Sequence, residues 1–164
     1  MSEPGKTRLV RYDPERHGDG PWQVVGTVFA AYGFEIGEYD EDVARPHEFY
    51  VEPAGAFMVA ETDDGRVVGC VGITDEGEGE FRLNRLYTLP EARRVGLGTR
   101  LVQWVIDEAR KRGAGKLVLF SDVAFEDAHR LYERMGFRRN RFRYAPDHWQ
   151  SREWGFEMML GEGA

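Results

Sequence analysis

The chain has 164 residues, of which 41% are hydrophobic and 31% are charged, the composition of an ordinary globular protein with room for one substantial core. Its formal net charge of −7 argues against nucleic acid as a partner, because a phosphate backbone needs a basic protein face. The negative charge suits a cationic small molecule or peptide, and it also serves solubility.

Cysteine and histidine usage excludes several kinds of site. Cys70 is the only cysteine, so neither a disulfide within the chain nor a cysteine-based metal cluster is possible, as expected in a reducing cytoplasm. The four histidines have no metal-ligand spacing, and we predict no metal. Residues 1–8 are polar with no apolar core after them, and the apolar run 24–34 is too short to cross a bilayer. We therefore expect a cytoplasmic protein with no membrane partner.

The first half of the chain predicts a strand, a helix and an antiparallel meander. Residues 7–12 alternate as a strand that Asp13-Pro14 ends, and residues 21–34 carry apolar side chains at helical spacing. The acidic stretch 35–48 is a loop or a short helix, and its charges form either a solvated face or a rim that attracts a cationic acceptor. Three further strands are expected at 56–62, 67–74 and 80–89.

The second half predicts a crossover helix and a parallel strand pair. The helix starts after Gly96 and ends near Gly113, and residues 116–121 form a compact apolar strand. One face of this helix is predicted to be apolar and carries Leu97, Leu101, Val102, Val105, Ile106 and Ala109. Because a strand, a helix and another strand form a right-handed crossover, 80–89 and 116–121 should be parallel neighbours. A helix at 126–135 and strands at 137–144 and 152–160 follow. The predicted fold class is α/β, with a twisted mixed sheet that carries helices on both faces.

The stretch Leu83–Gly98 carries a pattern that suits an anion. It reads as a strand, a proline stop, a basic loop and the glycines Gly96 and Gly98 before a helix, so backbone N–H groups and the helix dipole would face a phosphate. It lacks the third glycine of a dinucleotide fingerprint, since Leu101 stands there, and Thr99-Arg100 does not complete a Walker loop. From this loop alone, two interpretations remain open: a phosphate-binding site and a plain glycine turn.

A second pattern makes the interpretation more specific. Residues 128–137 read AHRLYERMGF, one strand after the glycine loop and its helix. A strand ending in LYTLP, then Arg-x-x-Gly-x-Gly, a helix, an apolar strand and A-x-x-LY-x-x-x-GF resembles the GNAT superfamily of acetyl-CoA-dependent N-acetyltransferases. The resemblance is specific over 83–137 and weaker over 56–160.

The resemblance implies a GNAT-like fold of about seven strands and about four helices, in which the two central parallel strands splay apart. It implies one domain over 1–164, with 83–137 as the acetyl-CoA-binding core and 1–55 on the acceptor side. The pantetheine arm of acetyl-CoA, the cosubstrate, would pair with backbone near Leu86, Tyr87 and Thr88. The other implied cofactor contacts are Arg93, Arg94, Val95, Gly96, Leu97, Gly98 and Thr99 at the pyrophosphate, and Phe125, Ala128 and Tyr132 in the last motif. Phe125 stands where the family commonly has asparagine, so an apolar contact would replace a polar one.

Two residues are candidates for catalysis. By resemblance, Tyr132 stands near the thioester sulfur and protonates the leaving thiolate, and the alternative is a core aromatic residue. Glu80 is the candidate base, because alternation puts it on one face with Arg82 and Asn84; the alternative is an exposed carboxylate beside Arg82. Some family members carry a glutamate where this chain has Arg82 and Asn84, so a water-mediated proton path is also open. A backbone N–H at or near Thr88 would hold the developing oxyanion.

These patterns favour direct acetyl transfer from acetyl-CoA to a primary amine of a small molecule or peptide, in a ternary complex. The alternative is a non-catalytic acyl-CoA-binding sensor or assembly module with the same fold, and a binder of another phosphorylated ligand is a third interpretation. His129 is either a packed histidine or a residue near the acceptor. The acceptor would be chosen by the first helix, by 35–48 and by the loop near Pro146, and aromatic residues in the last strands could support a homodimer.

Overall fold

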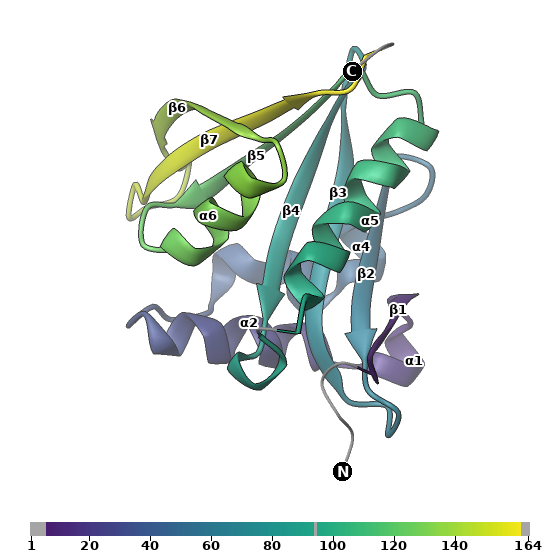
Figure 1. The fold of residues 1–164 in the computed structure, drawn as a ribbon. Coiled ribbons are helices and arrows are strands. Elements are labelled where there is room, and N and C mark those ends of the chain that lie inside the picture. The colour runs from purple at the N-terminus through teal and green to yellow at the C-terminus, as the bar shows by residue number, and fades with distance from the viewer. Residues whose placement is uncertain (1–5, 94, 162–164) are drawn as a thin grey trace.

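The computed structural model describes residues 6–93 and 95–161. Seven strands and the helices between them follow the predicted order closely (Figure 1). The elements are β1 (Arg8–Arg11), α1 (Pro14–His17), α2 (Gly20–Ala31), the 3-10 helix η2 (Glu38–Asp40), α3 (Glu41–Ala44), α4 (Pro46–Phe49), β2 (Gly55–Glu61), β3 (Val67–Gly77), β4 (Glu80–Thr88), the 3-10 helix η3 (Pro90–Ala92), α5 (Leu97–Lys111), β5 (Lys116–Asp122), α6 (Glu126–Arg134), β6 (Arg138–Tyr144) and β7 (Arg152–Met159). None of the helices in these two ranges is both long and apolar enough to span a membrane.

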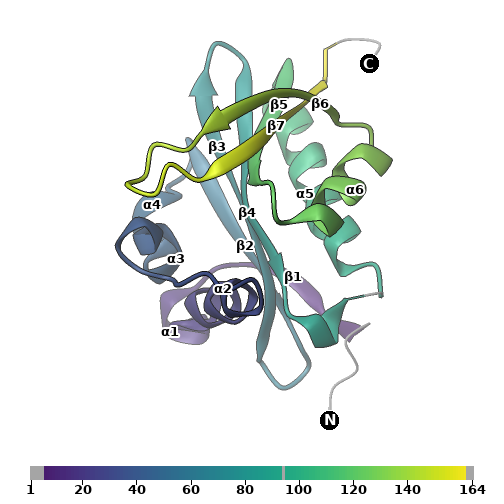
Figure 2. The same cartoon turned by 90° about the vertical axis from the view of Figure 1, so that its left-hand side faces the viewer.

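All seven strands lie in one mixed sheet, in the order β1-β2-β3-β4-β5-β7-β6. Only β4 and β5 are parallel neighbours, and the other pairs are antiparallel. Helices α1 to α4 cover one face of the sheet, and α5 and α6 cover the other (Figure 2). The predicted α/β fold, with a mixed sheet and helices on both faces, is confirmed.

Helix α5 buries the apolar side that its sequence predicts. The buried side chains on this helix are Leu97, Leu101, Val102, Val105, Ile106 and Ala109. They pack against β3 and β4, where Gly69 leaves the space: a Cβ there would lie 3.3 Å from side-chain carbons of both Leu97 and Leu101. This packing fixes the start of α5 close to the end of β4.

The two parallel strands pair over a short length and then separate. Glu80–Arg82 of β4 pairs with Lys116–Val118 of β5, and no further pairing joins these two strands. A β-bulge follows in β4, where the register to β3 shifts and Arg85 has a φ of 57°. Beyond it, β4 stays paired with β3 and β5 stays paired with β7, so the facing edges of β4 and β5 enclose a gap (Figure 1).

Two segments differ from the sequence predictions in detail. The chain after β1 forms the short helix α1, because Asp13 caps it by accepting the N–H of Glu15 at 2.9 Å and Pro14 occupies its first turn. The acidic stretch 35–48 divides into η2, α3 and most of α4 rather than one loop or one helix. Proline at position 46 explains this break, since it cannot continue the preceding helix.

Candidate active site

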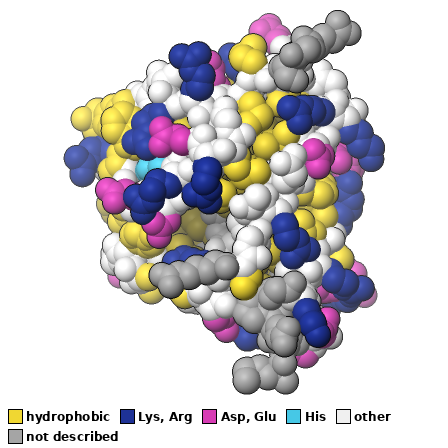
Figure 3. Space-filling view, in the orientation of Figure 1, with side chains coloured by type: hydrophobic (Ala, Val, Ile, Leu, Met, Phe, Trp, Pro, Cys, Tyr) yellow, Lys and Arg dark blue, Asp and Glu magenta, His cyan; other side chains and the backbone are white. Residues whose placement is uncertain are grey.

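The gap between β4 and β5 opens into a cavity of about 1520 Å³. Its walls come from α2 and the segment after it, from β4 and β5, from the start of α5, from α6 and from the loop before β7. The space-filling view shows this region as a hollow with hydrophobic side chains at its bottom (Figure 3). The cavity is large enough for two ligands, since a drug-sized ligand needs only ~300–1,000 Å³.

One end of the cavity is the N-terminus of α5. Gly96, with a φ of 79°, precedes the helix, and no side chain caps it. The first intrahelical bond runs from the N–H of Arg100 to the carbonyl of Gly96 at 3.0 Å. The N–H groups of residues 97–99 therefore have no acceptor within the helix, and these residues line the cavity. Together with the helix dipole, these N–H groups form a binding site for an anion, called the phosphate seat below.

The structure brings most of the predicted loop residues to this seat. Arg93 lines the cavity, and its Nη2 donates to the carbonyl of Thr88 at 3.1 Å. Gly98 permits close approach of α6, because a Cβ there would lie 3.1 Å from Cδ2 of Leu131. Val95 is 45% exposed and is not part of the lining. Arg94 lies outside the described residues.

The edge of β4 offers backbone hydrogen-bonding groups to the cavity. Leu86, Tyr87 and Thr88 all line it, as predicted. The N–H of Leu89 donates to Val68 on β3 at 2.9 Å. Because successive N–H groups alternate along a strand, the N–H of Thr88 points to the opposite edge, toward the gap. An extended chain that carries amides could pair with this edge.

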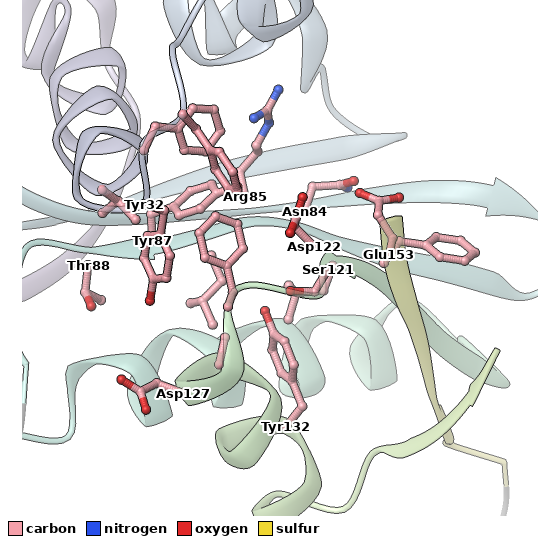
Figure 4. Close-up of a pocket in the computed structure, with 18 of the residues that line it drawn as sticks. Tyr32, Asn84, Arg85, Tyr87, Thr88, Ser121, Asp122, Asp127, Tyr132 and Glu153 are labelled. Atoms are coloured by element: carbon pink, nitrogen blue, oxygen red, sulfur yellow. The ribbon is translucent and has the colours of Figure 1, made fainter. Parts of the chain in front are cut away.

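Tyr132 reaches the cavity from α6. Its ring is 4% exposed and packs against Phe137 and Phe156, at centroid distances of 5.7 and 5.5 Å. The side chain rises from the helix with its hydroxyl toward the space under β4 (Figure 4). Burial raises the pKa of Tyr132, and the nearby Tyr87 phenol raises it further. Tyr132 is thus both a core aromatic residue and a protonated donor in the cavity wall.

Phe125 and Ala128, from the same motif, also line the cavity. Phe125 belongs to an aromatic cluster with Phe29, Tyr32, Phe34 and Tyr87, in which ring centroids lie 4.8 to 6.4 Å apart. Removal from water raises the pKa of Tyr87 to about 12, so this phenol also stays protonated. The cluster gives the cavity an apolar wall beside the β4 edge.

Glu80 does not lie in the cavity. It is the first residue of β4, at the end where β4 and β5 are paired, and Lys116 is 3.5 Å away. Thr88 is eight residues further along the strand, or about 26 Å at ~3.3 Å per residue. The alternation of the sequence indicated the face of Glu80 correctly, but it does not show how far along the strand the cavity begins. The expectation that Glu80 is the base is therefore not supported by its position.

The polar floor of the cavity lies on the face of the sheet opposite α5 and α6. Arg82 and Asn84 from β4 line this floor with Asp122 from β5. Asp122 is paired in register with Glu153 of β7, and Glu153 is paired with Arg143 of β6. Figure 4 shows Asp122 and Glu153 at the cavity. Sequence reasoning missed the contributions of β5, β6 and β7. The alternation in 116–122 indicates which side chains of β5 share a face, but not that β7 inserts between β5 and β6.

Two further candidate groups, His129 outside the cavity lining and Arg85 within it, have structural partners. His129 is 2% exposed, its Nε2 lies 3.0 Å from Oγ of Ser121, and burial lowers its pKa, so it is a packed, neutral histidine. Arg85, at the bulge, binds Asp40 at 2.9 Å and Asp42 at 2.7 Å, which fixes the acidic segment to β4. These two aspartates are held by an arginine, so they are not simply a solvated rim.

Comparison with known proteins agrees with this architecture. The sequence model of the acetyltransferase (GNAT) family matches residues 24–137. An uncharacterized N-acetyltransferase of Schizosaccharomyces pombe is 35% identical over 100 residues, which are 60% of this chain and 61% of that protein, less than two thirds of its length. The uncharacterized N-acetyltransferase YjgM of Escherichia coli K12 is 30% identical over 122 residues, 70% of this chain and 72% of that protein.

The fold has a close counterpart among solved structures. A crystal structure of a GNAT acetyltransferase from Staphylococcus aureus Mu50 superposes with a TM-score of 0.82, over 94% of this chain and 99% of that one. At 16% identity this likeness concerns the fold alone. The matched sequence region contains α5, β4, β5 and α6, which build most of the cavity. The chain belongs to the GNAT acetyltransferase family.

Proposed function

We propose that this protein is an N-acetyltransferase that moves the acetyl group of acetyl-CoA to a primary amine of a small molecule or peptide. Transfer would be direct, with both substrates bound in the cavity at once. One observation carries the proposal: an uncapped helix N-terminus and the free edge of β4 meet in a single cavity. A phosphate-bearing chain with amide groups would use both features.

The residues present fit coenzyme A. The N–H groups of residues 97–99 would bind the pyrophosphate, with Arg93 beside it. The β4 edge at Leu86–Thr88 would pair with the pantetheine amides, and Phe125 and Ala128 would contact this arm. Gly96 supports the assignment, since its positive φ shapes the loop without a side chain over the N–H groups.

The protein would contribute positioning and proton transfer. Acetyl-CoA supplies an activated thioester, whose free thiol has a pKa of ~8.5 and so leaves readily. The N–H of Thr88 would donate to the thioester carbonyl oxygen, and Tyr132 would donate its proton to the leaving sulfur. The raised pKa of Tyr132 keeps the phenol protonated at neutral pH and so available as a hydrogen-bond donor to the sulfur, while full proton transfer to a thiolate of pKa ~8.5 is uphill.

Asp122 is our candidate for the group that accepts the amine proton, directly or through water. It lies on the cavity floor, while the neighbouring Glu153 is held by Nε of Arg143 at 2.8 Å. Oδ1 of Asp122 accepts the N–H of Ala124 at 2.9 Å, which orients the carboxylate, and none of the described lysines or arginines forms an ion pair with it. The amine acceptor would lie near this floor, between the 1–55 part of the chain and the loop before β7.

Thiol release tests the proposal. The purified protein is incubated with acetyl-CoA and a panel of polyamines, amino acids, aminoglycosides and peptide N-termini, and free thiol and acetylated amine are followed together. We expect equal amounts of both products for at least one class of amine, and no acetylated protein as an intermediate. Tight acetyl-CoA binding without turnover across the panel would contradict the proposal and favour a non-catalytic sensor.

A further inference from the structure

Arg82 stands on the cavity floor without a full set of partners. Its Nε is buried and has no hydrogen-bond partner. Within 6–93 and 95–161, no carboxylate forms an ion pair with its guanidinium, whose Cζ lies 5.3 Å from the centroid of the Phe120 ring. Buried donors in folded proteins are nearly always satisfied, so an orphaned one in a cavity wall calls for an explanation.

A second arginine lies against the same aromatic ring. Cζ of Arg143 is 3.6 Å from the centroid of Phe120, and its Nε donates to Glu153 at 2.8 Å. Both arginines line the cavity. Burial lowers the pKa of Arg82, and the charge of Arg143 lowers it further, so the two guanidinium groups are close enough to repel. The carboxylates of Glu76 and Glu153 raise the pKa of Arg82 and so offset part of this effect.

Phe120 has room for its ring on this face because Gly155 opposes it on β7. A Cβ at Gly155 would be 3.0 Å from Cε1 of Phe120 and 2.9 Å from Cβ of Arg141, tighter than side chains tolerate. The ring therefore forms a fixed platform for the two cations. An arginine that is held on an aromatic platform is pre-organised for an oxyanion, because its planar fork matches two oxygens.

The position of this pair relative to Asp122 defines the ligand further. Phe120 and Asp122 are two residues apart on β5 and share a face, about 6.6 Å apart along the strand. One ligand could therefore place an amine at Asp122 and an acidic group at Arg82. The floor is complementary to a small molecule that carries both charges.

We propose that Arg82, with Arg143, forms a subsite for an oxyanion on the acceptor, so that the preferred substrate is a short amine with a carboxylate or a phosphate group. This inference rests on the proposed acetyl transfer and adds the substrate class. The bound oxyanion would compensate the positive charge of Arg82, whose guanidinium has a buried Nε without a partner, and the pairing of Arg143 with Glu153 keeps the second guanidinium in place.

Matched acceptors test the subsite. β-Alanine and phosphoethanolamine carry the two kinds of oxyanion, and propylamine has the same amine without either. We expect kcat/KM for one of the acids to exceed that for propylamine by tenfold or more. Arg82→Gln should raise KM for that acid about ten- to a hundredfold more than KM for propylamine, the range for one charge-assisted hydrogen bond. Arg138→Gln, an exposed arginine of β6 outside the cavity, is the matched control.

Calorimetric binding of the acids in the presence of coenzyme A separates the two proposals, because it needs no turnover. Binding of an acid that Arg82→Gln weakens, without thiol release from any amine, would support the subsite and contradict catalysis. Turnover of propylamine as good as that of both acids, or an equal effect of Arg82→Gln on all three, would support catalysis and overturn the subsite. Arg82→Lys, which keeps the charge, should restore part of the acid preference and so exclude a folding defect.

Discussion

Gly96→Glu should weaken acetyl-CoA binding about a hundredfold or more while leaving the fold intact. Gly96 has a φ of 79°, and no atom lies within 4 Å of the position that its Cβ would take. The cost to folding is therefore backbone strain alone, about 1–2 kcal/mol for a residue in the left-handed region. In a chain of this size, that lowers Tm by roughly 2–8 °C.

The effect on binding should be much larger than this strain. A glutamate carboxylate beside the N–H groups of residues 97–99 would lie near the pyrophosphate. Two like charges ~5 Å apart repel by ~3 kcal/mol at an effective dielectric constant of ~20. This weakens the affinity roughly a hundredfold or more.

Gly65→Glu is the matched control for this prediction. Gly65 has a φ of 83° in the turn between β2 and β3, no atom lies within 4 Å of its Cβ position, and it is not part of the cavity. Both variants should lose similar amounts of Tm in a thermal melt, and only Gly96→Glu should lose acetyl-CoA binding by calorimetry. Normal binding by Gly96→Glu would show that the α5 N-terminus is not the phosphate seat.

Three other predictions concern the cavity residues. Tyr132→Phe should lower kcat by on the order of ten- to a thousandfold with little change in acetyl-CoA affinity, because it removes a proton donor but keeps the packed ring. Wild-type turnover by this variant would show that Tyr132 has only a packing role. Asp122→Asn should lower kcat/KM about a hundredfold or more, whereas Glu80→Gln, at the paired end of β4, should leave kcat/KM unchanged. The reverse pattern in steady-state kinetics would show that Glu80, not Asp122, is the base. The fold favours the protonated form of Tyr87, so its contribution to stability is present below pH ~10 and is lost as the pH rises toward about 12. Urea unfolding between pH 9 and 11.5 should show this loss in the wild type and a smaller loss in Tyr87→Phe, and equal losses would contradict the assignment.

Much of the fold follows from local sequence patterns. The strand and helix boundaries come from alternation, helical spacing and glycine or proline at the ends, and these act within a few residues. The buried face of α5 is an example, since all its predicted apolar residues pack on the sheet. The parallel pairing of β4 and β5 also follows, because the crossover connection allows little else.

The candidate site is predicted only where one segment builds it. The α5 loop and the α6 motif are contiguous, and the structure brings both to the cavity. The floor depends instead on long-range register: Asp122 opposite Glu153, and Glu153 opposite Arg143. No local pattern specifies that register, so Arg82 could be recognised as unpartnered only in three dimensions. Glu80 shows the same limit, since alternation fixes a face but not a distance along the strand.

The central claim is that the gap between β4 and β5, with the start of α5, binds acetyl-CoA and presents its acetyl group to an amine. A crystal structure with coenzyme A tests this most directly. We predict that the pyrophosphate will contact the N–H groups of residues 97–99, and that the pantetheine arm will lie along Leu86–Thr88 with its sulfur near the Tyr132 hydroxyl. Coenzyme A bound elsewhere on the protein, or in this gap with its sulfur remote from Tyr132, would contradict the account.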